Sequence, residues 1–135
     1  NQKKNFVISK FINQVLRLRD LSVFGDGSQI RAFCNVEDAA RGLSLLLNKG
    51  KKNEIYNIGN NEEPITMLNL AKKIKKLSNS KVKIIKVHFE NSDRSKDREI
   101  FKRYPDLTKI KKHTGYKPNI SLDDGIKRLL KNNEI

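Results

Sequence analysis

The sequence predicts an α/β protein, because segments with helical spacing of apolar residues alternate with short strand-like runs. Helical spacing is found in five segments, which begin near residues 5, 36, 67, 108 and 122. Strand-like runs are found at 21–24, 30–34, 54–59 and 81–89. The length of 135 residues is ordinary for one domain, so we expect a single unit, 1–135, with a small sheet and several helices.

The first helix is predicted over about 5–18, where apolar residues recur every three or four positions. The runs 21–24 and 30–34 flank Gly-Asp-Gly-Ser-Gln, a sequence typical of a turn. We therefore expect a hairpin that returns Arg31 towards Phe24. Asn35 can cap the next helix. Its inward face is expected to contain Val36, Ala39, Ala40, Leu43, Leu46 and Leu47.

The middle of the chain predicts a strand, a capped helix and a second strand. EIYNIG, residues 54–59, is a strand-like run that Gly-Asn-Asn ends, and Thr66 can cap the helix that follows. KVKIIKVHF, residues 81–89, alternates lysine with apolar residues, as a half-exposed strand does. The polar segment 90–99 predicts a loop.

The last third predicts two helices with clear boundaries. Asp106 or Thr108 opens a short helix that ends at Gly115, and Pro118 prevents its continuation. Ser121 and Asp124 resemble a capping box at the start of the final helix.

The composition limits the possible settings and partners. The net charge of +14, from 29 Lys and Arg against 15 Asp and Glu, favours an anionic partner such as a nucleic acid, a membrane surface or a phosphorylated ligand. The lysines are spread over several segments, however, as on solvated helix faces. No apolar stretch approaches the ~20 residues of a membrane helix, and no signal-peptide pattern is present. Cys34 cannot form an internal disulfide, which favours the cytoplasm.

The sequence contains no recognisable catalytic machinery. It has neither a Gly-x-Gly-x-x-Gly fingerprint nor a P-loop. His88 and His113 lie far apart without cysteine partners, so no metal site is expected. Cys34 lies in an apolar run and is interpreted as a small core residue rather than a nucleophile. Adjacent carboxylates such as Asp123 and Asp124 are typical of a helix start.

Two arginines are candidates for binding an anion. Arg31 follows the predicted turn, and a guanidinium matches phosphate oxygens with parallel hydrogen bonds. The aromatic ring of Phe24 and the extended backbone beside it could pack against a planar base. Arg103 precedes Pro-Asp at a helix start, where an anion is favoured. The alternative for both residues is an ordinary exposed arginine in a basic chain.

The order of four motifs resembles the extended short-chain dehydrogenases, the NAD-dependent epimerases and dehydratases that act on nucleotide sugars. The motifs are VFGDGSQIRAFCNVEDAARGL, EIYNIGNNEEPITMLNLAKKI, RYPDL and TGYKPNISLDDGI, and the similarity runs from about residue 6 to 130. The family often has Gly-x-Pro before the base-binding strand, whereas this chain has LRLRDLSV.

The resemblance implies a role for each candidate residue. It places Arg31 and Arg103 at the nucleotide diphosphate and Ser22, Val23 and Phe24 along the base pocket. It also implies that this chain is the C-terminal, substrate-binding part, without the N-terminal Rossmann half that holds the glycine-rich NAD loop and the Tyr-x-x-x-Lys pair. The parent enzyme is then a cytoplasmic homodimer that uses NAD, and this chain alone is expected to be inactive.

The sequence leaves several choices open. The nucleotide can be UDP, dTDP, CDP or GDP, and the reaction can be an epimerisation, dehydration or decarboxylation. The alternative function is a stand-alone basic module that binds nucleic acid or another polyanion.

Overall fold

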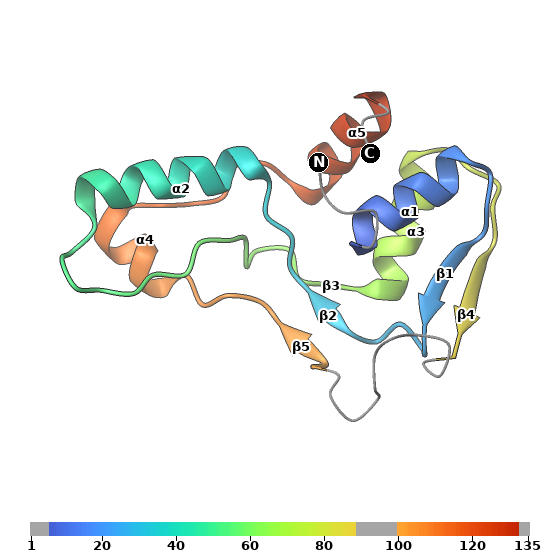
Figure 1. Ribbon diagram of the computed structural model, residues 1–135, viewed down its shortest axis with the longest axis horizontal. Helices are drawn as coiled ribbons and strands as arrows, with labels where there is room; N and C mark the ends of the chain where they lie inside the picture. The colour runs from blue at the N-terminus through green and yellow to red at the C-terminus, as the bar shows by residue number, and fades with distance from the viewer. Residues whose placement is uncertain (1–5, 89–99, 133–135) are drawn as a thin grey trace.

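The computed structural model describes residues 6–88 and 100–132, and it shows five helices and five short strands within them (Figure 1). The helices are α1 (Val7–Leu16), α2 (Val36–Lys49), α3 (Met67–Leu77), α4 (Thr108–Thr114) and α5 (Leu122–Asn132). The strands are β1 (Leu21–Phe24), β2 (Ile30–Arg31), β3 (Ile65–Thr66), β4 (Ile84–Val87) and β5 (Lys102–Arg103). The predicted α/β class is confirmed. None of the helices in these two ranges is long and apolar enough to cross a membrane.

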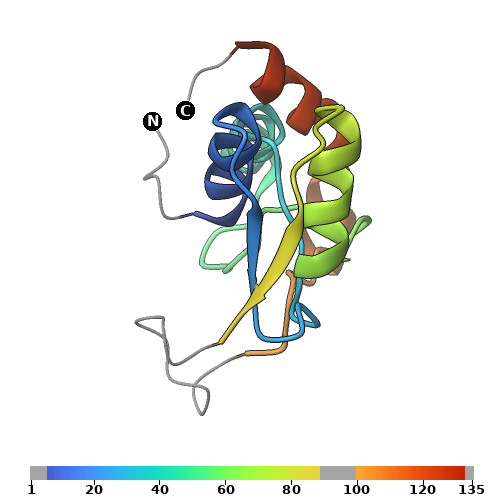
Figure 2. The ribbon, with the colours of Figure 1, turned by 90° about the vertical axis from the view of Figure 1, so that its right-hand side faces the viewer.

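The strands form two small sheets rather than one. β1 pairs with β4 in parallel, with Leu21 opposite Ile84. β2 lies between β3 and β5, antiparallel to the first and parallel to the second. The helices α1 and α3 flank the β1–β4 pair, which is best seen from the side (Figure 2).

The predicted hairpin between 21–24 and 30–34 is wrong, because β1 and β2 belong to different sheets. The connecting turn is bonded to the start of α3 instead. Leu68 donates its backbone N–H to the carbonyl of Gly27, and Met67 donates to the carbonyl of Gln29. These bonds lead the chain away from β1 before it reaches Ile30.

The predicted strand at 54–59 is also wrong, since these residues pair with no strand in the described part of the chain. Their side chains still alternate as in a strand. Tyr56 and Ile58 pack against a small cluster of buried residues, whereas Ile55 is exposed. The predicted strands 30–34 and 81–89 shorten to Ile30–Arg31 and Ile84–Val87. The loop expected at 90–99 lies outside the described residues.

Local capping follows the sequence closely. Asn35 accepts the N–H of Glu37 at 2.9 Å, and Thr66 accepts the N–H of Asn69 at 3.2 Å. The expected caps of α4 and α5 are equally clear. Asp106 accepts the N–H of Thr108 at 2.8 Å. Ser121 accepts the N–H of Asp124 at 3.1 Å while its hydroxyl donates to the Asp124 carboxylate. Gly115 ends α4 with a φ of +73°.

Two separate clusters of buried apolar residues form the core. The larger lies among α1, β1, α3 and α5 and contains Phe11, Ile12, Val15, Leu21, Val23, Leu70, Ala71, Ile74, Val82, Leu122 and Ile126. The smaller lies beneath α2 and contains Leu107, Ile110 and Tyr116, with Leu45, Leu46, Tyr56 and Ile58 packed against it. β2 runs between these two halves of the molecule (Figure 1).

The helix α2 presents a different face to the core from the one predicted. Its buried residues are Asp38 and Gly42, while Val36, Leu43 and Leu47 are exposed. Gly42 lies so close to Ile58 and Tyr116 that a Cβ there would fall 2.9–3.0 Å from their side chains. A small residue at this position therefore allows the helix to approach the smaller cluster.

We expect Gly27→Ala to destabilise the protein much more than Gly115→Ala. Both glycines have a left-handed backbone, with φ of +75° and +73°. A Cβ at Gly27 would lie 2.7 Å from Val23 and 2.9 Å from Leu68, whereas nothing lies within 4 Å of a Cβ at Gly115. Backbone strain alone costs about 1 kcal/mol, and overpacking adds about 1–3 kcal/mol at Gly27. Denaturant titration of both variants measures the difference, and equal losses would contradict the predicted overlap.

Candidate anion-binding site

The two candidate arginines lie side by side although they are far apart in the sequence. β2 and β5 run parallel, and Arg31 is in register with Arg103. Residues directly opposite each other on neighbouring strands project from the same face of the sheet. Two guanidinium groups on one face of a sheet can both donate hydrogen bonds to one anion.

The guanidinium of Arg31 is held against the backbone of its own sheet. Its Nη1 donates to the carbonyl of Ile30 at 2.9 Å and, more weakly, to the carbonyl of Phe101 at 3.4 Å. Ile30 itself donates its N–H to the carbonyl of Phe101 at 2.7 Å. Arg31 is half-buried and Arg103 is exposed. The guanidinium of Arg31 is thus oriented by backbone carbonyls, whereas Arg103 is exposed to solvent.

The three residues expected along the base pocket have different environments. Val23 is buried in the larger cluster, so its side chain does not face a ligand. The Ser22 hydroxyl accepts from the side-chain amide of Gln14 at 3.0 Å. Phe24 is partly exposed, and the ammonium of Lys10 lies 4.5 Å from the centre of its ring.

The amides of β1 alternate between its two edges. Leu21 and Gly25 donate their N–H groups to Lys83 and Val87 at 2.8 and 2.9 Å. Since amides alternate in direction along a strand, those of Ser22 and Phe24 point to the opposite edge. Ser22 confirms this direction, because its N–H approaches the Gln14 side chain at 3.4 Å. The structure therefore brings Arg31 and Arg103 together directly, whereas the β1 residues belong to the neighbouring sheet.

Asp38 is an important residue that the sequence reasoning did not single out. Its carboxylate is buried in α2 and accepts the N–H groups of Asn119 and Ile120 at 3.0 and 2.9 Å. Arg41 donates to the same carboxylate at 2.6 Å and also to the carbonyl of Lys117. The Val-x-Asp pattern at the start of α2 is the sequence feature that could have identified Asp38. Asp38 ties α2 to the segment that leads into α5.

The net effect of these contacts is to lower the pKa of Asp38. Burial of the carboxyl raises its pKa, but the hydrogen bonds from Arg41, Ile120 and Asn119 together outweigh that effect. Asp38 is therefore ionised at neutral pH and stabilises the folded state through charged hydrogen bonds.

Tyr116 and Cys34 lie near this carboxylate. Tyr116 is fully buried, and its hydroxyl donates to the carbonyl of Gly59 at 2.8 Å. Burial, followed by the contact with Cys34, raises the pKa of Tyr116 well above its usual value, so it stays protonated at neutral pH. Cys34 is exposed, which corrects its interpretation as a core residue. Partial burial of the sulfur raises the pKa of its thiol.

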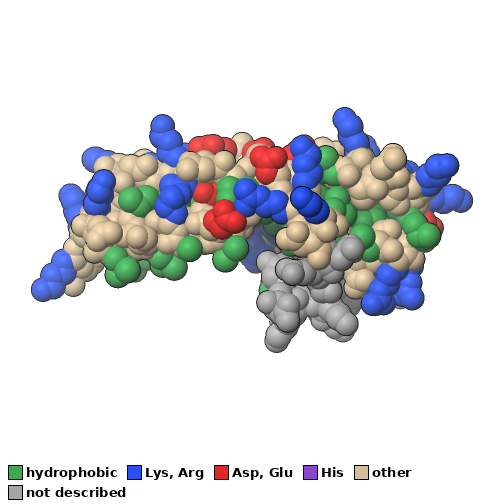
Figure 3. All heavy atoms as spheres, turned by 90° about the horizontal axis from the view of Figure 1, so that it is seen from above, with side chains coloured by type: hydrophobic (Ala, Val, Ile, Leu, Met, Phe, Trp, Pro, Cys, Tyr) green, Lys and Arg blue, Asp and Glu red, His purple; other side chains and the backbone are tan. Residues whose placement is uncertain are grey.

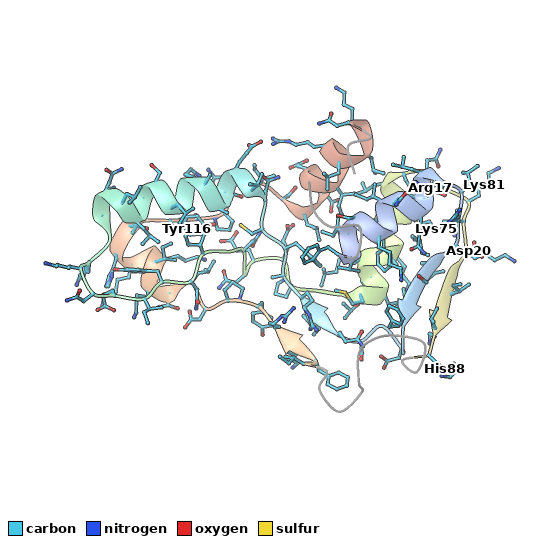
Figure 4. The ribbon with its side chains drawn as sticks, viewed as in Figure 1. Arg17, Asp20, Lys75, Lys81, His88 and Tyr116 are labelled. Atoms are coloured by element: carbon cyan, nitrogen blue, oxygen red, sulfur yellow. The ribbon has the colours of Figure 1, made fainter. Side chains whose placement is uncertain are left out.

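The histidines lie in separate places. His113 contacts the Tyr56 hydroxyl through Nδ1 at 2.7 Å, and His88 follows β4 at the other end of the molecule from Tyr116 (Figure 4). Within residues 6–88 and 100–132, no three His, Cys, Asp or Glu side chains are grouped so that they could hold a metal ion.

The fold is α/β, and its β2–β5 pair places Arg31 directly opposite Arg103. The family model of the NAD dependent epimerase/dehydratase family matches residues 1–59. The chain is 36% identical to UDP-N-acetyl-alpha-D-glucosaminuronate decarboxylase of Bacillus cytotoxicus, over 92% of this chain and 38% of that protein. It is 37% identical to UDP-glucuronic acid decarboxylase 4 of Arabidopsis thaliana, over 93% of this chain and 26% of that protein.

Solved structures with a similar fold are also enzymes of UDP sugars by name. UDP-glucose 4-epimerase from Thermotoga maritima, crystallised with UDP-glucose, has a TM-score of 0.82 and 28% identity over 96% of this chain and 40% of its own. UDP-glucuronic acid 4-epimerase from Bacillus cereus, in complex with UDP-glucuronic acid and NAD, has a TM-score of 0.81 and 26% identity over 98% and 41%. The chain belongs to the NAD dependent epimerase/dehydratase family. It spans less than half the length of these relatives.

We expect Asp38→Asn to destabilise the fold by about 1.5–3 kcal/mol at neutral pH, because it removes charged hydrogen bonds. The pKa of Asp38 is lower in the folded state, so its contribution is present above the unfolded pKa of about 3.9 and is lost as the pH falls through the folded value. The difference between wild type and variant should therefore shrink below about pH 4.

Urea titrations at several pH values measure this difference, and Glu37→Gln is the matched control. Glu37 lies beside Asp38 in the same helical turn, but its ion pair with Arg128 is exposed and contributes little. A loss in Asp38→Asn that equals the loss in Glu37→Gln would contradict the assigned role.

Proposed function

We propose that this chain is the nucleotide-sugar-binding portion of a longer, NAD-dependent nucleotide-sugar epimerase, dehydratase or decarboxylase. The pairing of Arg31 with Arg103 is the observation that carries the proposal. A diphosphate can accept bidentate hydrogen bonds from both guanidinium groups.

The base is proposed to lie along the edge of β1 that faces away from β4. The Phe24 ring offers a partly exposed aromatic surface, and the Phe24 amide points towards that edge. Ser22 lines the same edge with its hydroxyl, while Val23 contributes only backbone because its side chain is buried. Binding the two ends of the nucleotide in this way fixes where the attached sugar projects.

UDP is the nucleotide that we propose first. The names of several similar curated relatives, including the Bacillus cytotoxicus and Arabidopsis thaliana enzymes, specify UDP sugars. The relatives supply the choice of base, whereas the arginine pair supports any nucleoside diphosphate.

NAD, which the family uses for hydride transfer, finds no glycine-rich loop to hold its pyrophosphate among the described residues 6–88 and 100–132. The turn at 25–27 is its best glycine-rich candidate, but the space above Gly27 is filled by Val23 and Leu68. The first amides of α3, from Met67 and Leu68, already donate to Gln29 and Gly27. Neither feature can cradle a pyrophosphate. We therefore propose that NAD binds to the remainder of the longer protein.

The isolated chain is accordingly expected to show no epimerase, dehydratase or decarboxylase turnover with UDP-sugars. An assay of product formation with added NAD tests this expectation. Turnover above background by the purified 135-residue chain would overturn the assignment of the chemistry to the missing part.

The rival function is polyanion binding through the basic surface. Residues 67–88 contain seven lysines and no acidic residue. Seen from above, however, Lys and Arg side chains are spread over the molecule rather than gathered in one stripe (Figure 3). A general polyanion site predicts a steep loss of affinity with salt and little preference for a base.

We expect Arg31→Ala to weaken UDP binding by at least about tenfold, because charged hydrogen bonds to the diphosphate are lost. Isothermal titration with UDP, dTDP, CDP and GDP at low and moderate salt measures both the loss and the base preference. Arg31→Lys should recover only part of the affinity, since lysine keeps the charge but not the planar donor pair.

The control for this titration is Arg19→Ala, which removes an exposed arginine outside the β2–β5 pair. Equal losses in the two alanine variants, or DNA binding that is steep in salt and indifferent to Arg31, would favour the polyanion module and overturn the proposal.

A further inference from the structure

The two connections that lead from a helix into β1 and β4 meet at one end of the molecule. α1 continues into β1 through residues 17–20, and α3 continues into β4 through residues 78–83. Because β1 and β4 are parallel, with Leu21 opposite Ile84, both connections lie at the same end of the strand pair. Asp20 joins them, since its carboxylate accepts the N–H of Lys83 at 2.8 Å. This end, at the right in Figure 1, is far from the half that contains α2.

Cationic side chains are concentrated around these two connections. They are Arg17, Arg19, Lys75, Lys76, Lys81 and Lys83, and we call these six residues the basic end. Figure 4 shows Arg17, Lys75 and Lys81 in this part of the molecule, with Asp20 beside them. Asp20 is the one carboxylate within 17–20 and 75–83, and it is already bonded to the backbone of Lys83.

The basic end differs from the rest of the surface in having no ion pairs. The ion pairs found within residues 6–88 and 100–132 are Asp38–Arg41, Lys73–Asp123, Glu54–Lys109, Glu62–Lys111 and Glu37–Arg128. None of them includes a residue of the basic end. Positive charge is therefore left without a neutralising carboxylate at this place, which favours an anionic partner there.

An apolar side chain lies in the middle of this charge. Leu18, between Arg17 and Arg19, is 83% exposed and has a left-handed backbone with a φ of +53°. This conformation is unfavourable for leucine, and burial within the chain does not compensate for it. A strained backbone that carries an exposed apolar side chain indicates a functional role. Leu16, 44% exposed, adds apolar surface beside it.

The combination of cations and leucine distinguishes between anionic partners. An anionic bilayer offers both phosphate headgroups for the cations and an acyl layer for an apolar side chain. A nucleic acid offers phosphates but no apolar layer for Leu18. Residues 16–20 and 75–83 also include no aromatic side chain on which a base could stack.

We propose that the basic end binds to the surface of an anionic membrane, with Leu18 inserted between the headgroups. The attraction of each cation near such a surface adds to that of the others and falls as the salt concentration rises. The proposed nucleotide site does not take part, because Arg31 lies on β2 in the other sheet.

Sedimentation of the full-length protein with lipid vesicles tests the charges. Binding to an equal mixture of phosphatidylcholine and phosphatidylglycerol should be at least about tenfold tighter than to phosphatidylcholine alone. The double variant Arg17→Gln/Lys81→Gln should weaken binding to the mixture by about 25-fold, at about fivefold for each cation.

The matched control is Lys51→Gln/Lys52→Gln, which removes the same charge from exposed lysines just after α2. It should change vesicle binding by no more than about twofold, because these lysines lie far from the basic end. Equal losses in the two double variants would contradict the proposal, as would equal binding to both kinds of vesicle.

The variant Leu18→Asn tests the inserted side chain separately from folding. Asparagine tolerates the left-handed backbone, so the melting temperature should not fall. Vesicle binding should nevertheless weaken by about tenfold, because the apolar contact with the acyl layer is lost. Unchanged vesicle binding in Leu18→Asn, or tighter binding to a short DNA duplex than to the vesicles, would overturn the proposal. No nucleotide is added, so the result is independent of whether Arg31 binds one.

Discussion

The position of β2 between two partners is the constraint on which the other features depend. Its two residues pair antiparallel with β3 and parallel with β5, so three distant parts of the sequence meet at Ile30 and Arg31. The bond from Ile30 to Phe101 then determines which residue of β5 lies opposite Arg31. A slip of one residue would turn Arg103 to the other face of the sheet. The arginine pair therefore exists only because this register is maintained.

Local features of the fold could be predicted from the sequence, whereas strand partners could not. The caps Asn35, Thr66 and Ser121 bond to backbone amides two or three residues further on, so the local sequence is enough to predict them. The pairing of β1 with β4 is a long-range choice. It depends on the bonds between the 25–29 turn and α3, which no propensity at 21–34 reveals.

The same contrast applies to α2 and to the candidate site. Hydrophobic periodicity placed Val36, Leu43 and Leu47 inside, but the buried face is chosen by the Asp38 hydrogen bonds and by the close approach at Gly42. Residue type alone identified Arg31 and Arg103 as possible anion ligands. The sequence could not predict that Arg31 and Arg103 lie opposite each other. This placement requires the parallel register between β2 and β5, which are far apart in the chain.

Besides the pairing of β2, two charge-dependent contacts join the halves of the molecule. Asp38 connects α2 to the segment before α5, and the exposed Arg128–Glu37 ion pair spans the same gap with a weak contribution. The arginine pair lies at the junction of the halves, on strands of two residues each. Strands so short contribute little rigidity, so the spacing of the two guanidinium groups depends on what holds the halves together. A diphosphate bound to both strands would tighten this junction, and tightening it would in turn favour the bound anion. The proposed function therefore implies that binding at Arg31 and cohesion of the α2 half are coupled through β2.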